Sequence, residues 1–233
     1  MQIVPGVFQV NGTPYGRPQN SYFVQAGDAS FLIDSGDGRL PSCLPEIERN
    51  AARWGLSIDG ASHLFLTHEH FDHASHAAAI RGRGVRVVAS APCADALDAA
   101  DERCIGWMQA SPFEPCVVDH VLAGGEELSV GGLGVRCIAA PGHSDGSVIY
   151  EIELNGEICW FSGDLVGTRV GHDGIELGWT GAVDFDKRKS IETFRSLIDR
   201  PCDNLFPGHG RPVIGGAKEV LGFAYGLALV EWR

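Results

Sequence analysis

The amino-acid sequence predicts an α/β protein arranged as a four-layer αββα sandwich. Apolar runs of strand length alternate with helix-like periodic segments along all 233 residues. Each half is rich in expected strands, with helices expected outside, as in two packed sheets that helices cover. No internal repeat or low-complexity linker interrupts the chain, so we expect one domain over residues 1–233. Composition alone would not distinguish this architecture from other α/β folds.

The first half of the chain is expected to begin with strands. Short apolar runs bounded by Gly, Pro or polar residues predict strands, and longer periodic runs predict helices. The expected strands cover residues 7–10, 21–25, 31–34, 63–67 and 85–89. The expected helices cover residues 44–54, 74–80 and 95–108, and Asp72 is the expected N-cap of the second helix.

The second half continues with strands that end near Pro-Gly or Ser-Gly pairs. Strands are expected at residues 117–122, 133–140, 157–161 and 204–206. A helix is expected at residues 187–198, and residues 217–232 resemble a closing amphipathic helix.

The most informative segment is Thr-His-Glu-His-Phe-Asp-His at residues 67–73. It follows a buried strand and precedes a helix, so His68 and His70 can point the same way while Glu69 and Phe71 point elsewhere. Neutral imidazoles together with a carboxylate suit divalent metal ions. The alternative is a polar turn that happens to be rich in histidine. Three histidines within six residues after a buried strand favour a shared metal site.

Three later motifs each present one further candidate ligand just beyond an expected strand. They are Pro-Gly-His at His143, Ser-Gly-Asp at Asp164 and Pro-Gly-His-Gly at His209. A strand end is rigid and the loop after it is exposed, which suits a preorganised site. Five of the nine histidines fall in these motifs and in the first segment. The ordered set is stronger evidence than any single motif.

These motifs resemble those of the metallo-β-lactamase superfamily, on its metallohydrolase side with glyoxalase II and the bacterial lactonases. The resemblance runs from residues 31–36 to the last Pro-Gly-His-Gly loop, and every position of the ligand pattern is filled. It implies two Zn²⁺ per chain, with Asp164 and a water or hydroxide between them. The implied ligands are His68, His70 and His143 for one metal and Asp72, His73 and His209 for the other.

Such a centre suits hydrolysis. Two divalent cations, less Asp72, Asp164 and a hydroxide, leave about one net positive charge. This charge lowers the pKa of bound water, and the bridging hydroxide would attack a carbonyl or phosphoryl centre. Asp72 is the expected partner for the proton of that water. Asp34 is expected to hold a ligand imidazole or the backbone of the cluster; the alternative is a cap for the turn at residues 35–36.

The substrate expected is a small ester, lactone or thioester with an acyl tail. Aromatic walls with Arg17 or Arg169 nearby would suit it. The alternatives are ordinary packing for Trp107, a loop anchor for Trp179 and a solvated side chain for His172. The candidate contacts are Tyr15, Trp107, Trp179, Arg169 and His172.

Composition and charge limit the partners. The formal net charge of −12 disfavours nucleic acid, because phosphate contacts need clustered Lys and Arg. No apolar run is long enough for a membrane span, and the N-terminus does not resemble a signal peptide, so the expected location is cytoplasmic. The seven cysteines form no C-x-x-C pair and are expected to be buried hydrophobes. A homodimer is compatible with the sequence.

Departures from known subfamilies narrow the function. Only 24 residues follow His209, whereas glyoxalase II adds a helical domain that binds glutathione. The β-lactamases of this motif lack the bridging Asp, and the flavodiiron oxygen reductases have Glu at the position of His70. One alternative stays open: a mononuclear iron oxygenase resembling the persulfide dioxygenases, with one Fe²⁺ on His68, His143 and Asp164. Mixed Fe/Zn or Mn loading also stays open.

Overall fold

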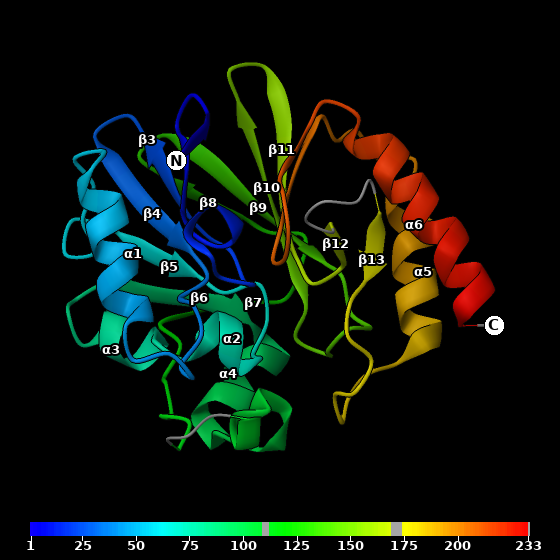
Figure 1. The fold of residues 1–233 in the computed structure, drawn as a ribbon, viewed down its shortest axis with the longest axis horizontal. Helices are drawn as coiled ribbons and strands as arrows, with labels where there is room; N and C mark the ends of the chain where they lie inside the picture. Colours follow the sequence, from blue (N-terminus) through cyan, green and yellow to red (C-terminus); the bar gives the residue numbers. More distant parts are fainter. Residues whose placement is uncertain (109–111, 169–173, 233) are drawn as a thin grey trace.

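Two β-sheets face each other at the centre of the molecule, and helices cover both outer faces (Figure 1). This computed structural model describes residues 1–108, 112–168 and 174–232. Within them, seven strands form the first sheet in the order β1-β2-β3-β4-β5-β6-β7. Six strands form the second in the order β15-β14-β11-β10-β9-β8, and β12 pairs with β13 in a separate ribbon.

The strands of the first sheet come from the N-terminal half. Antiparallel pairing joins β1 to β4 in sequence, and β4 to β7 run parallel. The bounds are β1 (Gln2–Val4), β2 (Val7–Asn11), β3 (Ser21–Ala26), β4 (Ala29–Ile33), β5 (His63–Phe65), β6 (Arg86–Ser90) and β7 (His120–Leu122).

The second sheet and the ribbon come from the C-terminal half. Only β11 and β14 are parallel neighbours in this sheet. The bounds are β8 (Glu127–Val130), β9 (Leu133–Ala139), β10 (Val148–Leu154), β11 (Glu157–Gly163), β12 (Val166–Thr168), β13 (Ile175–Leu177), β14 (Asn204–Pro207) and β15 (Val213–Ile214).

The helices divide between the two outer faces. In Figure 1, α1 to α4 lie beside the first sheet, and α5 and α6 lie on the opposite side of the molecule. The α-helices are α1 (Cys43–Ala52), α2 (Phe71–Ala74), α3 (Ala77–Arg81), α4 (Ala91–Ala99), α5 (Lys187–Leu197) and α6 (Ala217–Glu231). Short 3₁₀ helices are η1 (Thr13–Tyr15), η2 (Glu102–Cys104) and η3 (Gly106–Met108).

Three apolar clusters lie between these layers and hold them together. One lies between the sheets and includes Phe65, Tyr150 and Phe161. A second joins the first sheet to its helices, and a third joins the second sheet to α5 and α6. Three buried interfaces between four layers confirm the predicted αββα sandwich. All seven cysteines are free and buried, as expected. No helix within the described ranges is long and apolar enough to cross a membrane.

Strand order brings the ligand loops to one edge. The parallel strands β4 and β5 end side by side, so Asp34 and Thr67 are neighbours, and the Thr67 N–H donates to Asp34 Oδ1 at 2.8 Å. In the second sheet, β11 leads to Asp164 and its parallel neighbour β14 leads to His209. Carboxyl ends of parallel strands meet at one sheet edge, so residues far apart in sequence converge there.

Several predicted helix boundaries were wrong. Asp72 is not an N-cap: it lies inside α2, which follows His70 and has no side-chain cap. The helix expected at 74–80 is split between α2 and α3, because the His76 N–H donates to Ser35 Oγ at 3.1 Å. The helix expected at 95–108 starts earlier, capped by Ser90, and ends where Ala100 turns left-handed at φ 48°.

Other differences concern weak patterns. Only His120–Leu122 of the strand expected at 117–122 pairs with β6. Short or mixed strands such as β1, β8, β12, β13 and β15 escaped prediction, as did the longer β10. The closing helix buries Leu221 and Ala224, yet its outer face exposes Phe223 and Val230. It is therefore apolar on both faces rather than amphipathic.

Candidate metal centre

The first group of ligand atoms joins the N-terminal cluster to the loop after β9. His68 and His70 lie on the turn between β5 and α2, and His143 lies on the loop after β9; all three imidazoles are buried. His70 Nδ1 lies 3.0 Å from His143 Nε2. The ligand atoms of His68, His70 and His143 all fall within 4.8 Å of one another. One ion could be held by all three.

The second group lies beside the first and joins α2 to the loop after β14. His209 Nε2 is 3.3 Å from Asp72 Oδ2 and 3.4 Å from His73 Nε2. His73 Nε2 and Asp72 Oδ2 are 3.8 Å apart. These three residues form a second possible ligand set within 4.8 Å. Asp72 supplies its ligand atom from within α2.

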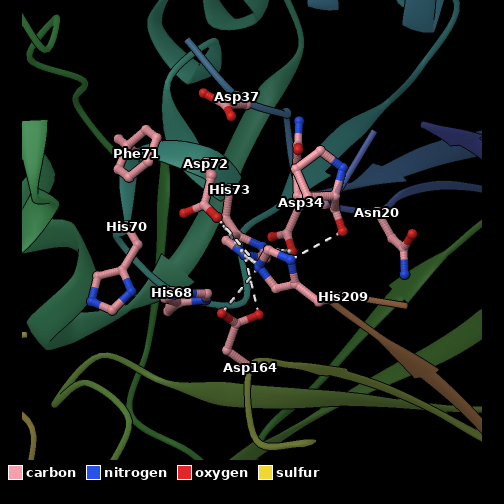
Figure 2. A network of polar contacts seen from close by, with 12 residues as sticks. Asn20, Asp34, Asp37, His68, His70, Phe71, Asp72, His73, Asp164 and His209 are labelled. Atoms are coloured by element: carbon pink, nitrogen blue, oxygen red, sulfur yellow. Dashed lines mark hydrogen bonds and ion pairs between the residues drawn. The ribbon is translucent and has the colours of Figure 1, made fainter. Parts of the chain in front are cut away.

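Asp164 connects the two groups (Figure 2). One carboxylate oxygen, Oδ1, lies 3.2 Å from His73 Nε2. The other, Oδ2, lies 3.5 Å from His143 Nε2 and 3.3 Å from His209 Nε2. One carboxylate therefore faces both ligand groups. The structure brings together all seven ligand residues singled out in the sequence.

The donor set fits divalent metal ions. Imidazole nitrogens and carboxylate oxygens at one point are typical zinc ligands. His68 Nε2 is buried and has no hydrogen-bond partner among the described residues, although its other ring nitrogen lies 3.1 Å from Thr67 Oγ1. A buried polar atom without a partner is costly unless it binds something. Together these residues form a candidate two-metal centre.

The first ligand group favours neutral imidazoles. Burial lowers the pKa of His68 and His70 well below the usual value, with neighbouring histidines adding to the effect. Burial also lowers the pKa of His143. Neutral imidazole is the form that binds metal, so these side chains need not lose a proton near neutral pH.

The second group carries more negative charge. Burial alone would lower the pKa of His73 and His209, but Asp164 and Asp72 raise it, to about 10 for His209. Burial alone would raise the pKa of Asp72, yet His73 and His209 lower it to about 2. The pKa of Asp164 is also held well below its usual value, by His209 and His73 against the effect of burial. This group therefore attracts positive charge, as a cation site should.

Asp34 holds the His73 imidazole. Its Oδ2 lies 2.8 Å from His73 Nδ1, and its carboxylate also accepts hydrogen bonds from the backbone and hydroxyl of Thr67. The Asp34 backbone is left-handed, with φ 57°, a conformation that is uncommon outside glycine and typical of functional sites. The next residue, Ser35, donates to the His73 carbonyl. This turn orients the ring so that Nε2 faces the other ligands.

Asn20 and Tyr22 hold the loop that carries His209. The buried Asn20 amide donates to the carbonyls of Pro207 and Gly210, at 2.8 and 3.1 Å. The Tyr22 hydroxyl donates to the Pro207 carbonyl at 2.8 Å. His209 Nδ1 lies 3.0 Å from the Pro18 carbonyl. The sequence did not indicate these roles for Asn20 and Tyr22, because they depend on contacts with residues nearly 190 positions away in the chain.

Two further features of the first ligand segment were also missed. Glu69 points away from the ligands into the interior, where burial and then Asp184 raise the pKa of its carboxyl to about 8. Arg39 pairs with the buried Asp37 and lies 4.8 Å from the Phe71 ring centre. The alternation of residues 68–73 indicated only that Glu69 and Phe71 face away from the metal.

A cleft of about 460 Å³ opens beside the centre, and Asp164, His209 and Trp179 are among its lining residues. Neither Tyr15 nor Trp107 lines it. The Tyr15 hydroxyl donates to the Gln9 carbonyl, and Trp107 is 71% exposed. The positions of Tyr15 and Trp107 outside this cleft do not support their predicted substrate roles.

The structure does not bring the other three candidate substrate contacts to this cleft within the described residues. The Arg17 guanidinium pairs with Glu46, with its Nε 2.9 Å from a carboxylate oxygen, so it is already engaged. Arg169 and His172 lie outside the described residues.

A family model now identifies the fold and its motif. The model described as the metallo-beta-lactamase superfamily matches residues 14–209, a range that includes all seven candidate ligands. The chain belongs to the metallo-beta-lactamase superfamily.

Solved structures of this superfamily share the fold. A metallo-beta-lactamase from Cronobacter sakazakii, a HARLDQ motif mutant, superimposes with a TM-score of 0.77 at 21% identity, covering 100% of this chain and 94% of that one. BJP-1, a subclass B3 metallo-beta-lactamase of Bradyrhizobium japonicum, has a TM-score of 0.76 at 20% identity, covering 99% and 90%.

Curated relatives in the superfamily are longer than this chain. A beta-lactamase-like protein 2 homolog of Drosophila melanogaster is 27% identical over 90% of this chain and 62% of its own length. Thioesterase pkgB of Emericella nidulans is 28% identical, over 90% and 49%. A hydroxyacylglutathione hydrolase of Anaeromyxobacter dehalogenans is 29% identical, over 64% and 49%. The chain thus spans about half to three fifths of the length of these relatives.

Proposed function

We propose that this protein is a dinuclear zinc hydrolase of small thioesters, esters or lactones. The observation that carries the proposal is the arrangement of two ligand groups around one carboxylate. His68, His70 and His143 would hold one ion and Asp72, His73 and His209 the other, with Asp164 facing both. Among the three substrate classes we favour thioesters, because relatives named thioesterase and hydroxyacylglutathione hydrolase align with this chain.

The ligands and Asp72 have distinct roles in this proposal. Zinc bound there would lower the pKa of a water molecule and stabilise negative charge on the carbonyl oxygen of the substrate. Asp72 Oδ2 lies 3.3 Å from His209 Nε2, so its carboxylate stands at the centre and could accept a hydrogen bond from that water. Asp34 keeps the His73 ring in place.

The balanced reaction is simple. The acyl C–S or C–O bond breaks, the oxygen of water joins the acyl carbon, and the protons of water end on the carboxylic acid and the leaving thiol or alcohol. Asp72 would accept one proton during attack and return it as the leaving group departs.

The proposed partners are small molecules, not nucleic acids or membranes, in keeping with the net charge of −12. A cytoplasmic location and a homodimer remain part of this proposal.

A substrate panel with metal analysis tests the proposal. Purified protein loaded with zinc is assayed against thioesters, aryl esters, lactones and phosphodiesters, with Asp72→Asn as the comparison. We expect thioester or ester turnover with about two zinc ions per chain, reduced about 10²-fold or more in the variant, as for the loss of a general base. One iron per chain with oxygen consumption on a persulfide would instead support the oxygenase alternative.

A further inference from the structure

The cleft beside the metal centre has an apolar wall to which the last helix contributes. Asp164 and His209 line it at the metal centre. Leu227 and Trp232, from the C-terminal end of α6, line it together with residues on and after β13. Figure 1 shows α6 lying along β13. The apolar lining residues are Ile175, Leu177, Trp179, Leu227 and Trp232.

Two glycines allow close packing beside Trp179. A Cβ added to Gly178 would lie 2.2 Å from the Asp164 carbonyl and 2.8 Å from His143 Nδ1. A Cβ added to Gly181 would lie 2.0 Å from Trp179 Cζ2, so the indole rests against that residue. No side chain larger than hydrogen fits at either position without movement. The backbone next to Trp179 therefore lies directly against two candidate metal ligands, while the indole is 48% exposed.

Packing also anchors Trp232. Its ring centre lies 5.4 Å from that of Phe185, with the rings inclined by 69° in an edge-to-face arrangement. It also packs against the apolar cluster between the second sheet and helices α5 and α6. Such aromatic pairs are favourable beyond the area that they bury. The apolar wall is therefore largely formed before any ligand binds, as is usual for small-molecule sites.

Apart from the candidate metal ligand His209, the charged lining side chains among the described residues are carboxylates. Glu176 and Glu231 line it in addition to Asp164, and no Lys or Arg among the described residues does so. Away from the metal centre, an anionic group in this part of the cleft would meet no cationic side chain of the described residues and would be repelled by Glu231. An uncharged apolar group would instead bury its surface against the two indoles.

We propose that this cleft binds an uncharged, apolar acyl group of the thioester substrate and that Leu227 and Trp232 set the selectivity for it. The inference rests on the proposed hydrolase function and adds the chemical class of the acyl group. A volume of about 460 Å³ lies in the lower part of the range for small-ligand pockets, so an acyl group such as hexanoyl or phenylacetyl fits better than a long fatty chain.

A thioester series with one leaving thiol tests the selectivity. We compare kcat/KM for acetyl, butanoyl, hexanoyl, phenylacetyl and glutaryl thioesters of N-acetylcysteamine. From acetyl to hexanoyl we expect a gain of roughly fourfold for each added methylene, the value for a buried CH₂. The glutaryl thioester should be at least about tenfold poorer than hexanoyl, because its carboxylate meets Glu231.

Variants of the wall separate its role from that of the fold. Trp232→Ala and Leu227→Gln should each lower the hexanoyl rate by about tenfold, as expected for losing apolar burial, while changing the acetyl rate less than twofold. Glu231→Gln should reduce the difference in kcat/KM between the glutaryl and hexanoyl thioesters. Phe223→Ala, on the outward face of α6, is the matched control and should change none of these ratios. Acyl preferences that are the same in all four variants and in the wild type would overturn the inference.

A binding measurement keeps the inference testable if no thioester is cleaved. The metal-loaded protein is titrated with 2-octanone and, separately, with 5-oxohexanoate, while the indole N–H resonances are followed by NMR. We expect 2-octanone to bind the wild type and its affinity to fall about tenfold in Trp232→Ala. The affinity of the wild type for 5-oxohexanoate should be lower than for 2-octanone. Ketone binding without hydrolysis would contradict the hydrolase proposal alone. Hydrolysis with no apolar preference would contradict this inference alone.

Discussion

The two halves of the molecule supply the metal centre in different ways. The N-terminal sheet contributes His68, His70, Asp72 and His73 from one turn of six residues, whereas the C-terminal sheet contributes His143, Asp164 and His209 from three separate loops. In the first case the local backbone brings the ligands together. In the second, only the pairing of strands β9 to β11 and β14 does so.

Each half also sends a buried tyrosine to the other. Tyr22, from the first sheet, donates to the Pro207 carbonyl at the start of the His209 loop. Tyr150, from the second sheet, donates to the Leu66 carbonyl two residues before His68, also at 2.8 Å. The difference teaches that the contiguous motif is locally organised, whereas the dispersed ligands depend on packing between the sheets.

The largest predicted effect is at Asp164, the ligand from the C-terminal half that faces both groups. Asp164→Asn keeps the shape of the side chain but removes its charge. Because electrostatic stabilisation by the centre supplies several kcal/mol, we expect activity to fall about 10³-fold. Zinc content should fall to about one ion per chain or less, measured by elemental analysis. The exposed Asp199→Asn is the control, and two retained zinc ions in Asp164→Asn would count against a shared ligand.

A direct comparison of the halves replaces one histidine from each in metal-free protein. His73 is fully buried among Asp34, Asp72 and Asp164, whereas the His209 side chain is 32% exposed. We expect His73→Ala to lower the free energy of unfolding by about 3 kcal/mol, as for breaking a buried ion pair. His209→Ala should cost about 1 kcal/mol or less, because the His209 side chain itself is partly solvated, although it shares Asp72 and Asp164 with His73.

Urea unfolding in the presence of a chelator measures both values. Equal losses for the two variants would show that the two halves hold their histidines alike and would remove the distinction.

The Asp34–His73 contact tests the locally organised half. Asp34→Asn weakens the hydrogen bond that orients His73, so zinc affinity should fall about 10- to 100-fold, the usual cost of losing a partner of a metal ligand. Competition with a chromogenic chelator gives the affinity. The exposed Asp28→Asn, in the turn between β3 and β4, serves as the control. Unchanged affinity in Asp34→Asn would leave that residue as a turn cap only.

The two tyrosines offer a smaller, symmetric test. Tyr22→Phe and Tyr150→Phe each remove a hydroxyl from a buried carbonyl, which should cost about 1 kcal/mol of unfolding free energy. Stepwise zinc removal distinguishes them. Tyr22→Phe should also weaken the zinc ion proposed for Asp72, His73 and His209, because the loop that Tyr22 contacts carries His209, whereas Tyr150→Phe should not weaken that ion. Identical zinc removal curves would contradict the dependence of His209 on packing between the sheets.

The last prediction is a pH dependence of stability in the first sheet. Burial, with Arg86 and His120 nearby, lowers the pKa of His63 to about 4. The unfolded chain therefore binds more protons than the folded protein between about pH 4 and 6.5, so stability falls on acidification through that window. His63→Phe, which can still pack against Phe65, should lose less stability there. Unfolding curves at pH 7 and pH 5 give the free energy of unfolding of both proteins. An equal loss of unfolding free energy between the two pH values in the wild type and in His63→Phe would contradict the prediction.

The sequence predicted the parts of the molecule that local patterns specify. The ligand motifs, which lie at or just beyond apolar strands, singled out the seven candidate ligands. The strand-rich halves suggested the αββα sandwich, and the family resemblance implied both that fold and the grouping of the ligands. Helix limits failed where tertiary contacts intervene, as at His76, whose N–H bonds Ser35 rather than extending the helix.

The roles of Asn20, Tyr22 and Tyr150 could not be predicted either, because their partners lie 84 or more residues away. The same holds for Leu227 and Trp232. They line the cleft only because α6 packs along β13, and no spacing in the last helix marks them as contacts.

The central claim is that both halves meet in one two-metal centre, and zinc reconstitution tests it most directly. Metal-free protein is titrated with zinc while bound metal and thioester hydrolysis are measured in the same samples. We predict two zinc ions per chain, with activity that reaches its plateau only as the second site fills. A plateau in both binding and activity at one zinc ion per chain would contradict the account.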